Sequence, residues 1–339
     1  MRWPAILLSF STLGVFGQTS PFTGAALEDP TWDGRYRLIL SGHLHGSSRD
    51  RSGFPAGTFL ANIDTINTLG AHAFLSTGDL FLDPAKDQQR YERALFSKLK
   101  VPLFNAPGNH DSNRHYYQRF GDGAALLRVG ADRVILLDTE RKDGTIDEAQ
   151  VALFEEVLDG PATPHVWIIS HRPLWAEGDD RYGPLFEGNT RSMLRTNYTR
   201  TVEPLLSRLA ERSKVFWVSG SMAGNARTSF FFQEHEPGIT FIQSAIRNEP
   251  WDALLIADVS PDTIIWSSFS LTGEPVLFPQ AYDADWWWSQ RSARPPFNYR
   301  LIPYYIKMTL LQPAFWYGAV LGLLITLLVV RLLRRRRMS

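Results

Sequence analysis

The stretch Val101–Asp111, VPLFNAPGNHD, constrains the fold of this chain more than any other part of it. Its apolar run ends in a Pro-Gly turn, so three polar residues follow directly after a predicted buried strand. Open α/β sheets collect their functional groups at such strand ends. Asn109 offers an amide oxygen to a cation, His110 a ring nitrogen or a proton, and Asp111 a carboxylate that could orient the ring. A polar turn whose side chains cap backbone groups is the alternative.

Two other stretches repeat this construction. Ala73–Leu80, AFLSTGDL, leads from an apolar strand into Gly78-Asp79, and His165–Pro173, HVWIISHRP, ends its strand at His171. Three strand ends therefore deliver an aspartate, an Asn-His-Asp group and a histidine, in that order. The occurrence of three such strand ends in one chain favours one shared site over three unrelated polar turns.

The ordered set resembles the calcineurin-like metallophosphoesterase family, whose successive motifs read D-x-H, G-D, G-N-H-D/E, H and G-H-x-H. Further matches lie between these motifs. Tyr116–Gly121 follows the GNHD turn, and Leu136–Glu140 precedes a helix that opens at Gly144–Gln150, as in the family. The resemblance covers about residues 35 to 271, which is most of the chain.

Helices alternate with strands early in the chain, and short strands dominate later. The predicted helices cover Phe59–Asn67, Gln88–Leu99, Ile146–Leu158 and Tyr198–Ser213, and the late strands cover Val215–Val218, Ser229–Phe232, Ile239–Gln243, Ala253–Val259 and Thr263–Phe269. This order suits two packed sheets with helices outside them. With the resemblance, it predicts an α/β fold over residues 33–272, a four-layer α/β/β/α sandwich of two mixed sheets.

The resemblance implies a centre of divalent metal ions, Mn, Fe or Zn, that hydrolyses phosphoesters by activating water and holding the phosphate oxygens. It gives Asp79 the bridging position between two ions, and it makes Asn109 and His171 ligands of the second ion. His110 would contact the phosphate and protonate the leaving oxygen, and Asp111 would fix the tautomer of its ring.

Arg172, beside His171, could meet the substrate phosphate together with Asn109 and His110, or it could pair with a surface acid. The remaining histidines near strand ends and turns are interpreted as structural: His72, His115 and His165.

The first family motif is altered in this chain, which reads Ser41-Gly42-His43-Leu44-His45 where D-x-H is expected. In one register Ser41 takes the place of the aspartate and His43 is the retained histidine. In the other, His43 takes that place and His45 is retained, which keeps two metal ligands. Two histidines in a polar turn without a metal are the alternative.

The last motif is lost, because Ser221-Met222-Ala223 follows Val215–Gly220 where the resemblance requires His-x-His. Each ion then lacks a histidine, unless His235 or a residue of the segment 176–197 replaces it. Asp79 alone would help to offset two dications, a poor charge balance for hard ions. We therefore expect an atypical centre with a single, weakly bound or substrate-assisted ion, or none.

The composition excludes several kinds of site and one class of protein. The 339 residues contain no cysteine, so disulfides and cysteine zinc sites are absent. Basic and acidic residues number 35 each, but six of the arginines lie at the two ends of the chain: Arg2, Arg331 and Arg334 to Arg337. Without them, 29 basic residues stand against 35 acidic ones, a balance of about −6. A nucleic-acid-binding protein would carry the opposite sign.

Both ends of the chain carry apolar segments. Pro313–Val330 has no charge, can be extended to Leu310, and is followed by Arg334–Arg337. This pattern predicts a transmembrane helix over residues 310–330, a cytoplasmic basic tail over 331–339 and an aromatic, basic juxtamembrane linker over 273–309. Residues 1–20 are predicted to be a signal peptide or an N-terminal anchor. The main domain would then lie in the periplasm, a lumen or the extracellular space.

Two functions follow from these features. The first is a membrane-tethered, extracytoplasmic metallophosphoesterase-like hydrolase with an atypical metal site, acting on a phosphoester near the lipid bilayer. The second is an inactive pseudophosphoesterase that serves as a binding or scaffold module at the membrane. A metallo-β-lactamase or an amidohydrolase barrel is opposed by the residues after His45 and by the strand-rich C-terminal half.

Overall fold

The structure is a computed structural model, and it describes residues 18–30, 33–46, 53–142, 144–186, 196–222, 227–290, 306, 310 and 313–336. The chain divides into two units, residues 1–292 and 293–339. The predicted signal segment lies almost entirely outside the described residues, as do Ala223 and residues 291–305 and 307–309 of the juxtamembrane stretch.

Unit 1 contains two mixed sheets. The first has the strand order β11-β10-β1-β2-β3 and the second β4-β5-β6-β7-β9-β8. The first sheet consists of β1 (Tyr36–Ser41), β2 (Ala73–Ser76), β3 (Leu103–Asn105), β10 (Ala253–Val259) and β11 (Ile264–Ser270). The second consists of β4 (Ala125–Val129), β5 (Asp132–Leu136), β6 (His165–Ser170), β7 (Lys214–Ser219), β8 (Phe230–Glu236) and β9 (Ile239–Ser244).

Each sheet contains a run of parallel strands and antiparallel strands beside it. The parallel runs are β1-β2-β3 and β5-β6-β7-β9, whereas β10, β11, β4 and β8 pair antiparallel with their neighbours. Parallel strands are covered on both faces, which explains why β1 and β6 read as nearly continuous apolar runs. The parallel runs also bring several strand ends to one edge of each sheet.

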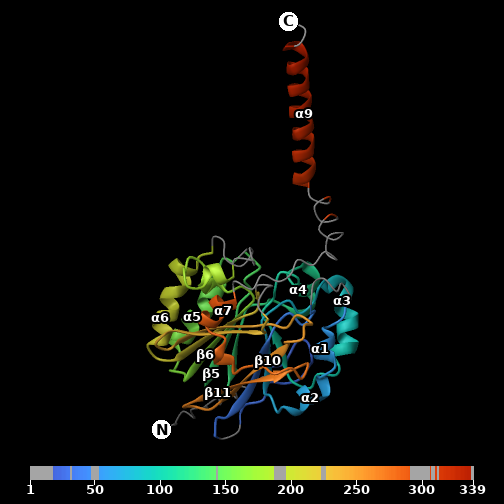
Figure 1. The fold of residues 1–339 in the computed structure, drawn as a ribbon. Helices are drawn as coiled ribbons and strands as arrows, with labels where there is room; N and C mark the ends of the chain where they lie inside the picture. The colour runs from blue at the N-terminus through green and yellow to red at the C-terminus, as the bar shows by residue number, and fades with distance from the viewer. Residues whose placement is uncertain are drawn as a thin grey trace, which may run out of the picture. The chain divides into compact units, whose positions relative to one another are not determined.

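Helices cover the outer faces of the two sheets (Figure 1). Beside the first sheet lie α1 (Gly57–Leu60), α2 (Ile63–Thr68), α3 (Pro84–Tyr91) continued by η1 (Glu92–Phe96), and α4 (Arg114–Phe120). Beside the second lie α5 (Glu148–Asp159), and η4 (Tyr198–Val202) continued by α6 (Glu203–Ala210). Three apolar cores separate four layers, so the predicted α/β/β/α sandwich is confirmed.

Local signals explain the helix bounds. Asp83 caps α3 by accepting a hydrogen bond from the Ala85 amide, and Pro84 occupies the first helical position, so the helix begins four residues before the predicted start. Asp147 caps α5 in the same way through the Gln150 amide, and α5 ends at Asp159, one residue after the predicted end and directly before Gly160.

Residues 273–290, here called the closing segment, pack against the sandwich and do not form a linker. They contain η5 (Pro279–Ala281) and α7 (Ala284–Gln290). The Tyr282 carbonyl accepts from the Phe232 amide at 3.0 Å, and the Trp287 indole donates to the Phe230 carbonyl at 3.1 Å. The expected domain end at residue 272 is therefore corrected. Tyr282 and Trp287, two aromatic residues of the predicted juxtamembrane linker, are part of the core.

Residues 18–30 also belong to the domain. The Ser20 hydroxyl donates to the Leu103 carbonyl at 2.6 Å, and the Phe22 ring stacks on Phe120 with centroids 4.5 Å apart. These contacts fasten the segment to β3 and α4.

Unit 2 contains α9 (Pro313–Arg336). Its window Ala314–Arg331 has a mean hydropathy of 1.9, which makes it long and apolar enough to cross a membrane. The expectation of one C-terminal apolar helix is confirmed.

Candidate metal centre

The ends of four parallel strands meet at one edge of the sandwich. His43 and His45 follow β1, Asp79 follows β2, His110 follows β3 and His171 follows β6. The registers Ser41–Ser76 and Ser76–Asn105 bring the first three ends level with one another. The Ser244 carbonyl at the end of β9 accepts from the Gly42 amide and the Thr77 hydroxyl, which joins the second sheet to the first beside them.

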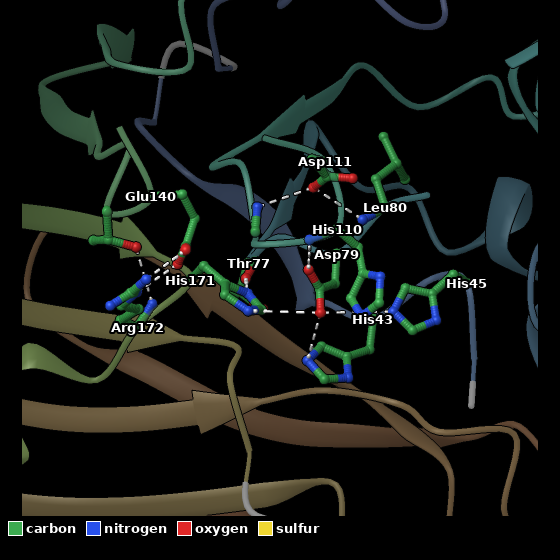
Figure 2. Close-up of polar contacts among 12 residues, drawn as sticks. His43, His45, Thr77, Asp79, Leu80, His110, Asp111, Glu140, His171 and Arg172 are labelled. Atoms are coloured by element: carbon green, nitrogen blue, oxygen red, sulfur yellow. Dashed lines mark hydrogen bonds and ion pairs between the residues drawn. The ribbon is translucent and has the colours of Figure 1, made fainter. Parts of the chain in front are cut away.

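Three histidine rings converge on one carboxylate oxygen. The Nε2 atoms of His43, His45 and His171 lie 3.5, 3.6 and 3.6 Å from Oδ2 of Asp79. Figure 2 shows these rings, together with that of His110, gathered around the carboxylate. The other carboxylate oxygen, Oδ1, accepts a hydrogen bond from the His110 backbone amide at 3.0 Å. The carboxylate is therefore held from one side and faces imidazoles on the other.

The ring nitrogens that face Asp79 are buried and unpartnered. Within the part of the chain that the structure describes, Nε2 of His43, His45 and His171 makes no hydrogen bond. Buried polar atoms are normally satisfied, so three unsatisfied nitrogens at one point require an explanation. The His171 ring donates through Nδ1 to the Thr77 carbonyl at 3.0 Å, which turns the lone pair of Nε2 toward Asp79.

The backbone around the carboxylate depends on two glycines. A Cβ on Gly108 would overlap the Asp79 carboxylate, and one on Gly78 would lie 2.6 Å from Nδ1 of His171. Asp79 and His43 themselves have φ values of +55°, which are uncommon for residues with a Cβ and occur often at functional sites. The GD and GNHD motifs thus need their glycines for close packing of the two turns.

The electrostatics of the centre suit a cation. Burial alone would raise the pKa of the Asp79 carboxyl, but His171, His45 and His43 together hold that pKa well below its usual value. Burial lowers the pKa of the His43 imidazole well below its usual value, which favours the neutral form that binds metals. A carboxylate beside a neutral imidazole is a donor set for a divalent ion.

Asp111 does not contact the His110 ring. Its carboxylate accepts hydrogen bonds from the amides of Leu80, Phe81 and Gly108 at 3.1, 2.9 and 3.0 Å, and Figure 2 shows the contact with Leu80. The His110 ring instead pairs through Nδ1 with the Leu82 carbonyl at 3.1 Å. The expectation that Asp111 orients His110 is therefore wrong. Asp111 joins the turn after β2 to the turn after β3, and burial raises its pKa.

The Arg172 side chain forms an ion pair with a buried carboxylate. Its guanidinium forms a two-pronged pair with Glu140, with N–O distances of 2.6 and 2.6 Å, and side-chain exposures are 4% for Arg172 and 5% for Glu140. The expected surface partner is thus replaced by a buried one. The Arg172 amide also donates to the Thr139 hydroxyl, which fastens the turn after β6 to the chain after β5. Its predicted contact with a substrate phosphate stays a prediction.

A serine, Ser221, follows β7 where the last motif would have a histidine. The amides of Gly220 and Ser221 donate to the His171 carbonyl at 3.0 and 2.7 Å, so the chain after β7 reaches the expected place without a histidine. His235 does not replace it. Glu236 pairs with Ile239 and Phe230 with Ser244, so His235 lies near the start of β9, roughly 17 Å along the strand from the centre.

The sequence did not predict three groups that form hydrogen bonds to side chains of the site. They are Glu140, the Thr77 carbonyl and the Leu82 carbonyl. Glu140 lies within the stretch that resembles the family, but nothing in its spacing pointed to Arg172. Backbone carbonyls carry no sequence signal at all. Asn109 lies half-buried in the same turn as His110, as its position in the motif requires.

The residues present fit a divalent ion. Two trios of ligand atoms lie within 4.8 Å of one another among the described residues: His43, Asp79 and His171, and His45, Asp79 and His110. Two atoms bound to one tetrahedral zinc at about 2.0–2.2 Å are roughly 3.3–3.6 Å apart. The three nitrogen–oxygen distances to Asp79 agree with this separation. The fold and this centre together define an α/β/β/α sandwich with a histidine-rich cluster that could hold a metal ion.

Comparison with known families identifies the domain. Residues 54–194 match the family model described as calcineurin-like phosphoesterase. The resemblance read from the motifs is thereby confirmed. The comparison with curated proteins gave no match.

Two solved structures are similar to this chain. One is a dimetal phosphatase from Danio rerio, with 14% identity, a TM-score of 0.48 and coverage of 72% of this chain and 98% of that one. Another is vacuolar protein sorting 29 from Cryptosporidium parvum, with 11% identity, a TM-score of 0.29 and coverage of 70% and 98%.

Proposed function

We propose that this protein is a membrane-tethered, extracytoplasmic phosphoester hydrolase that depends on a divalent metal ion. The observation that carries the proposal is the convergence of three buried, unpartnered imidazole nitrogens on the Asp79 carboxylate in the described part of the chain. A purely structural cluster would satisfy these atoms with hydrogen bonds. The family domain makes a phosphoester the expected class of substrate.

The ligands that we assign to this chain are Asp79, Asn109, His171, His43 and His45. A divalent ion bound by them would polarise a phosphoryl oxygen and lower the pKa of a bound water. The chain's own contribution is orientation. Asp79 is fixed through Oδ1 by the His110 amide, and His171 is fixed by the Thr77 carbonyl, so neither group must reorganise when substrate binds. We assign Asp111 a structural role, because its carboxylate holds the turns after β2 and β3 together.

The apolar helix α9 supports the membrane tether. Its side chains are exposed along the window Ala314–Arg331, and four arginines follow at Arg334–Arg337 in the sequence. A basic flank favours the cytoplasmic side, which would place unit 1 on the opposite side of the membrane. The substrate would then be a phosphoester outside the cytoplasm.

The test uses the full chain in detergent, freed of metal and then loaded with Zn²⁺ or Mn²⁺. We expect bound metal by elemental analysis and metal-dependent release of phosphate, or of a phosphoester product, from a panel of mono- and diesters. Asp79→Asn should lose both, and the exposed His115→Ala should lose neither.

Metal binding without turnover on any phosphoester would favour the second function, a pseudophosphoesterase that binds a partner or an anion at the membrane. The replacement of the last motif by Ser221-Met222 is the observation behind that alternative. Absence of bound metal in the wild-type chain would overturn the hydrolase.

A further inference from the structure

We propose that this protein has a second ligand site, separate from the metal centre, that binds a small quaternary ammonium ion. The site is a hollow of about 650 Å³ between the two sheets, here called the distal cavity. Its walls carry the aromatic rings of Phe216, Phe232 and Trp266, and its rim carries Glu234 and Lys214. None of the described residues that line it belongs to the metal centre, so binding there needs neither metal nor hydrolysis.

The distal cavity lies at the opposite end of the sandwich from the metal centre. It is lined by the first residues of β7, β9 and β11, which are Lys214, Ile239 and Ile264. Because β7 and β9 run parallel to β6, their starts lie away from the strand ends that carry the metal centre. Ile264 is level with Val259, which pairs with Tyr36 at the start of β1. The six residues of β7 separate the two sites by roughly 17 Å.

The inner faces of the second sheet change from core to charged residues at this cavity. Along β8, Phe230 and Phe232 belong to the core between the sheets, and Glu234 continues the same face two residues further. Along β7, Phe216 belongs to that core, and Lys214 precedes it with the same spacing. Protein interiors are close-packed and contain few voids larger than a water molecule. A cavity of this size against core rings, with polar groups beside them, has the usual form of a small-molecule site.

The aromatic walls stand at steep angles to one another. The Trp266 ring makes an interplanar angle of 78° with Phe232 and of 60° with Phe216, and the centroids lie 5.1 and 5.6 Å apart. Although they belong to the core, Trp266 and Phe216 keep 9% and 7% of their surface exposed. The face of an aromatic ring attracts a cation, and angled aromatic walls are the usual means of recognising a quaternary ammonium group.

The charges around the cavity favour a cation over an anion. Lys214 supplies one positive charge against the two negative charges of Glu234 and Glu236, a balance of −1. The Lys214 ammonium donates to the Asp262 carbonyl at 3.3 Å, whereas the Glu234 carboxylate forms no ion pair among the described residues. Burial lowers the pKa of His235, which also lines the cavity, so its ring adds no charge at neutral pH.

These features select a weakly hydrated cation with one polar group. A primary ammonium is strongly hydrated and would lose that water against aromatic walls, whereas the methyl groups of a quaternary ammonium can pack on the rings. The hydroxyl groups of Thr240 and Thr263 and the Gln280 amide line the same cavity and offer hydrogen bonds to a polar group of the ligand. Choline has this chemistry, and its trimethylammonium group is also present in a phosphatidylcholine headgroup.

The experiment is equilibrium dialysis of the metal-free full chain, in a maltoside detergent without ammonium groups, against radiolabelled choline. We expect saturable binding of one equivalent at millimolar or lower concentration, with displacement by tetramethylammonium. The neutral isostere of choline, which has a tert-butyl group in place of trimethylammonium, should compete at least about tenfold less well. Absence of saturable binding, or equal competition by the isostere, would overturn the proposal.

Variants locate the site in the distal cavity. Glu234→Gln, at an exposed side chain, should weaken choline binding about fivefold and leave the urea midpoint unchanged. Trp266→Leu should weaken binding at least about tenfold, and its urea midpoint shows whether it folds. Glu155→Gln, at an exposed carboxylate of α5 outside the cavity, should bind choline as the wild type does. Unchanged binding in Glu234→Gln or in folded Trp266→Leu would overturn the assignment.

Two further comparisons identify the source of the ligand and separate the two sites. Glycerophosphocholine adds a phosphate that would meet the carboxylates of the rim, so we expect it to compete at least about tenfold less well than choline. Competition equal to that of choline would support the site with a lipid headgroup as its ligand. Choline affinity should be the same in the metal-free and the Zn²⁺-loaded chain, whether or not the chain hydrolyses phosphoesters. An affinity that depends on Zn²⁺ would place choline at the metal centre and overturn the distal site.

Discussion

Asp111 illustrates at the residue scale how a residue can match a family motif while its structural role differs from the expected one. In the sequence it stands beside His110, which suggested a carboxylate–imidazole pair. In the structure it is fully buried and binds three backbone amides of two different turns, together with the Asn105 side chain at 3.1 Å. Its position secures the geometry of the centre without touching the histidine ring.

The substitution Asp111→Asn tests this role. One acceptor oxygen would be replaced by an NH₂ group that faces amide donors, so we expect a loss of about 2–4 kcal/mol in the free energy of unfolding. Urea denaturation of the full chain measures it. Asp122→Asn, at a side chain that is 78% exposed, should change the value by less than about 0.5 kcal/mol. Wild-type stability in Asp111→Asn would contradict the account.

Tyr36 occupies a second buried polar cluster, away from the metal centre. Its hydroxyl donates to Asp132 and accepts from the Trp167 indole at 3.1 Å, and Asp132 also accepts from His165 Nδ1 at 2.9 Å. These contacts tie β1 of one sheet to β5 and β6 of the other. The interpretation of His165 as a structural residue agrees with them.

Burial, and then the Asp132 carboxylate, raise the pKa of Tyr36 far above its usual value of 10.0. A raised pKa contributes stability that is complete below pH 10 and is lost as the pH rises, because the unfolded chain then releases a proton that the folded chain keeps. We expect Tyr36→Phe to reduce the alkaline loss of stability by about 1.4 kcal/mol per pH unit above pH 10. Urea midpoints between pH 8 and 11.5 check it, and parallel profiles for both proteins would refute it.

At the scale of elements, the closing segment decides where the domain ends. It covers the free edge of β8 with hydrogen bonds and places Tyr282 and Trp287, each 5% exposed, against the core. An uncovered edge strand is a template for aggregation. The segment therefore belongs to the sandwich in both packing and hydrogen bonding.

We predict that a chain ending at Gln290 keeps the wild-type urea midpoint and that one ending at Thr272 aggregates or loses at least about 4 kcal/mol. Trp287→Ala alone should cost about 3–5 kcal/mol, and Trp288→Ala, at a residue 38% exposed, should cost less than half as much. Size-exclusion chromatography and urea titration compare the four proteins. A stable monomer that ends at Thr272 would show that the segment is dispensable.

At the scale of the whole molecule, the proposed tether makes α9 responsible for membrane retention. Leu321→Arg with Ile325→Arg would place two charges in the middle of the apolar window, at a cost of about 2.5–3.5 kcal/mol each. We expect the double variant to be released by alkaline extraction, while Leu321→Ala with Ile325→Ala stays in the pellet. Retention of the arginine variant would show that another part of the chain binds the membrane.

Sequence alone determined the order of strand-end motifs, the family, the sandwich and the apolar helix. These features are encoded locally, because a buried parallel strand must be apolar and its end must carry the turn residues. Because sequence patterns report only local structure, they also led to wrong predictions. Residues 273–290 look like an interfacial aromatic stretch, and only the edge of β8, formed by residues 230–236, gives Tyr282 and Trp287 a place in the core.

Tertiary structure alone decided which groups meet at the centre. The sequence left two registers open for His43 and His45, and the structure brings both rings to the same oxygen of Asp79. It gave Arg172 a partner 32 residues away and placed His235 at the far end of its sheet. Contacts of this kind depend on the pairing of strands and on backbone carbonyls. The residue types in the sequence do not predict these contacts.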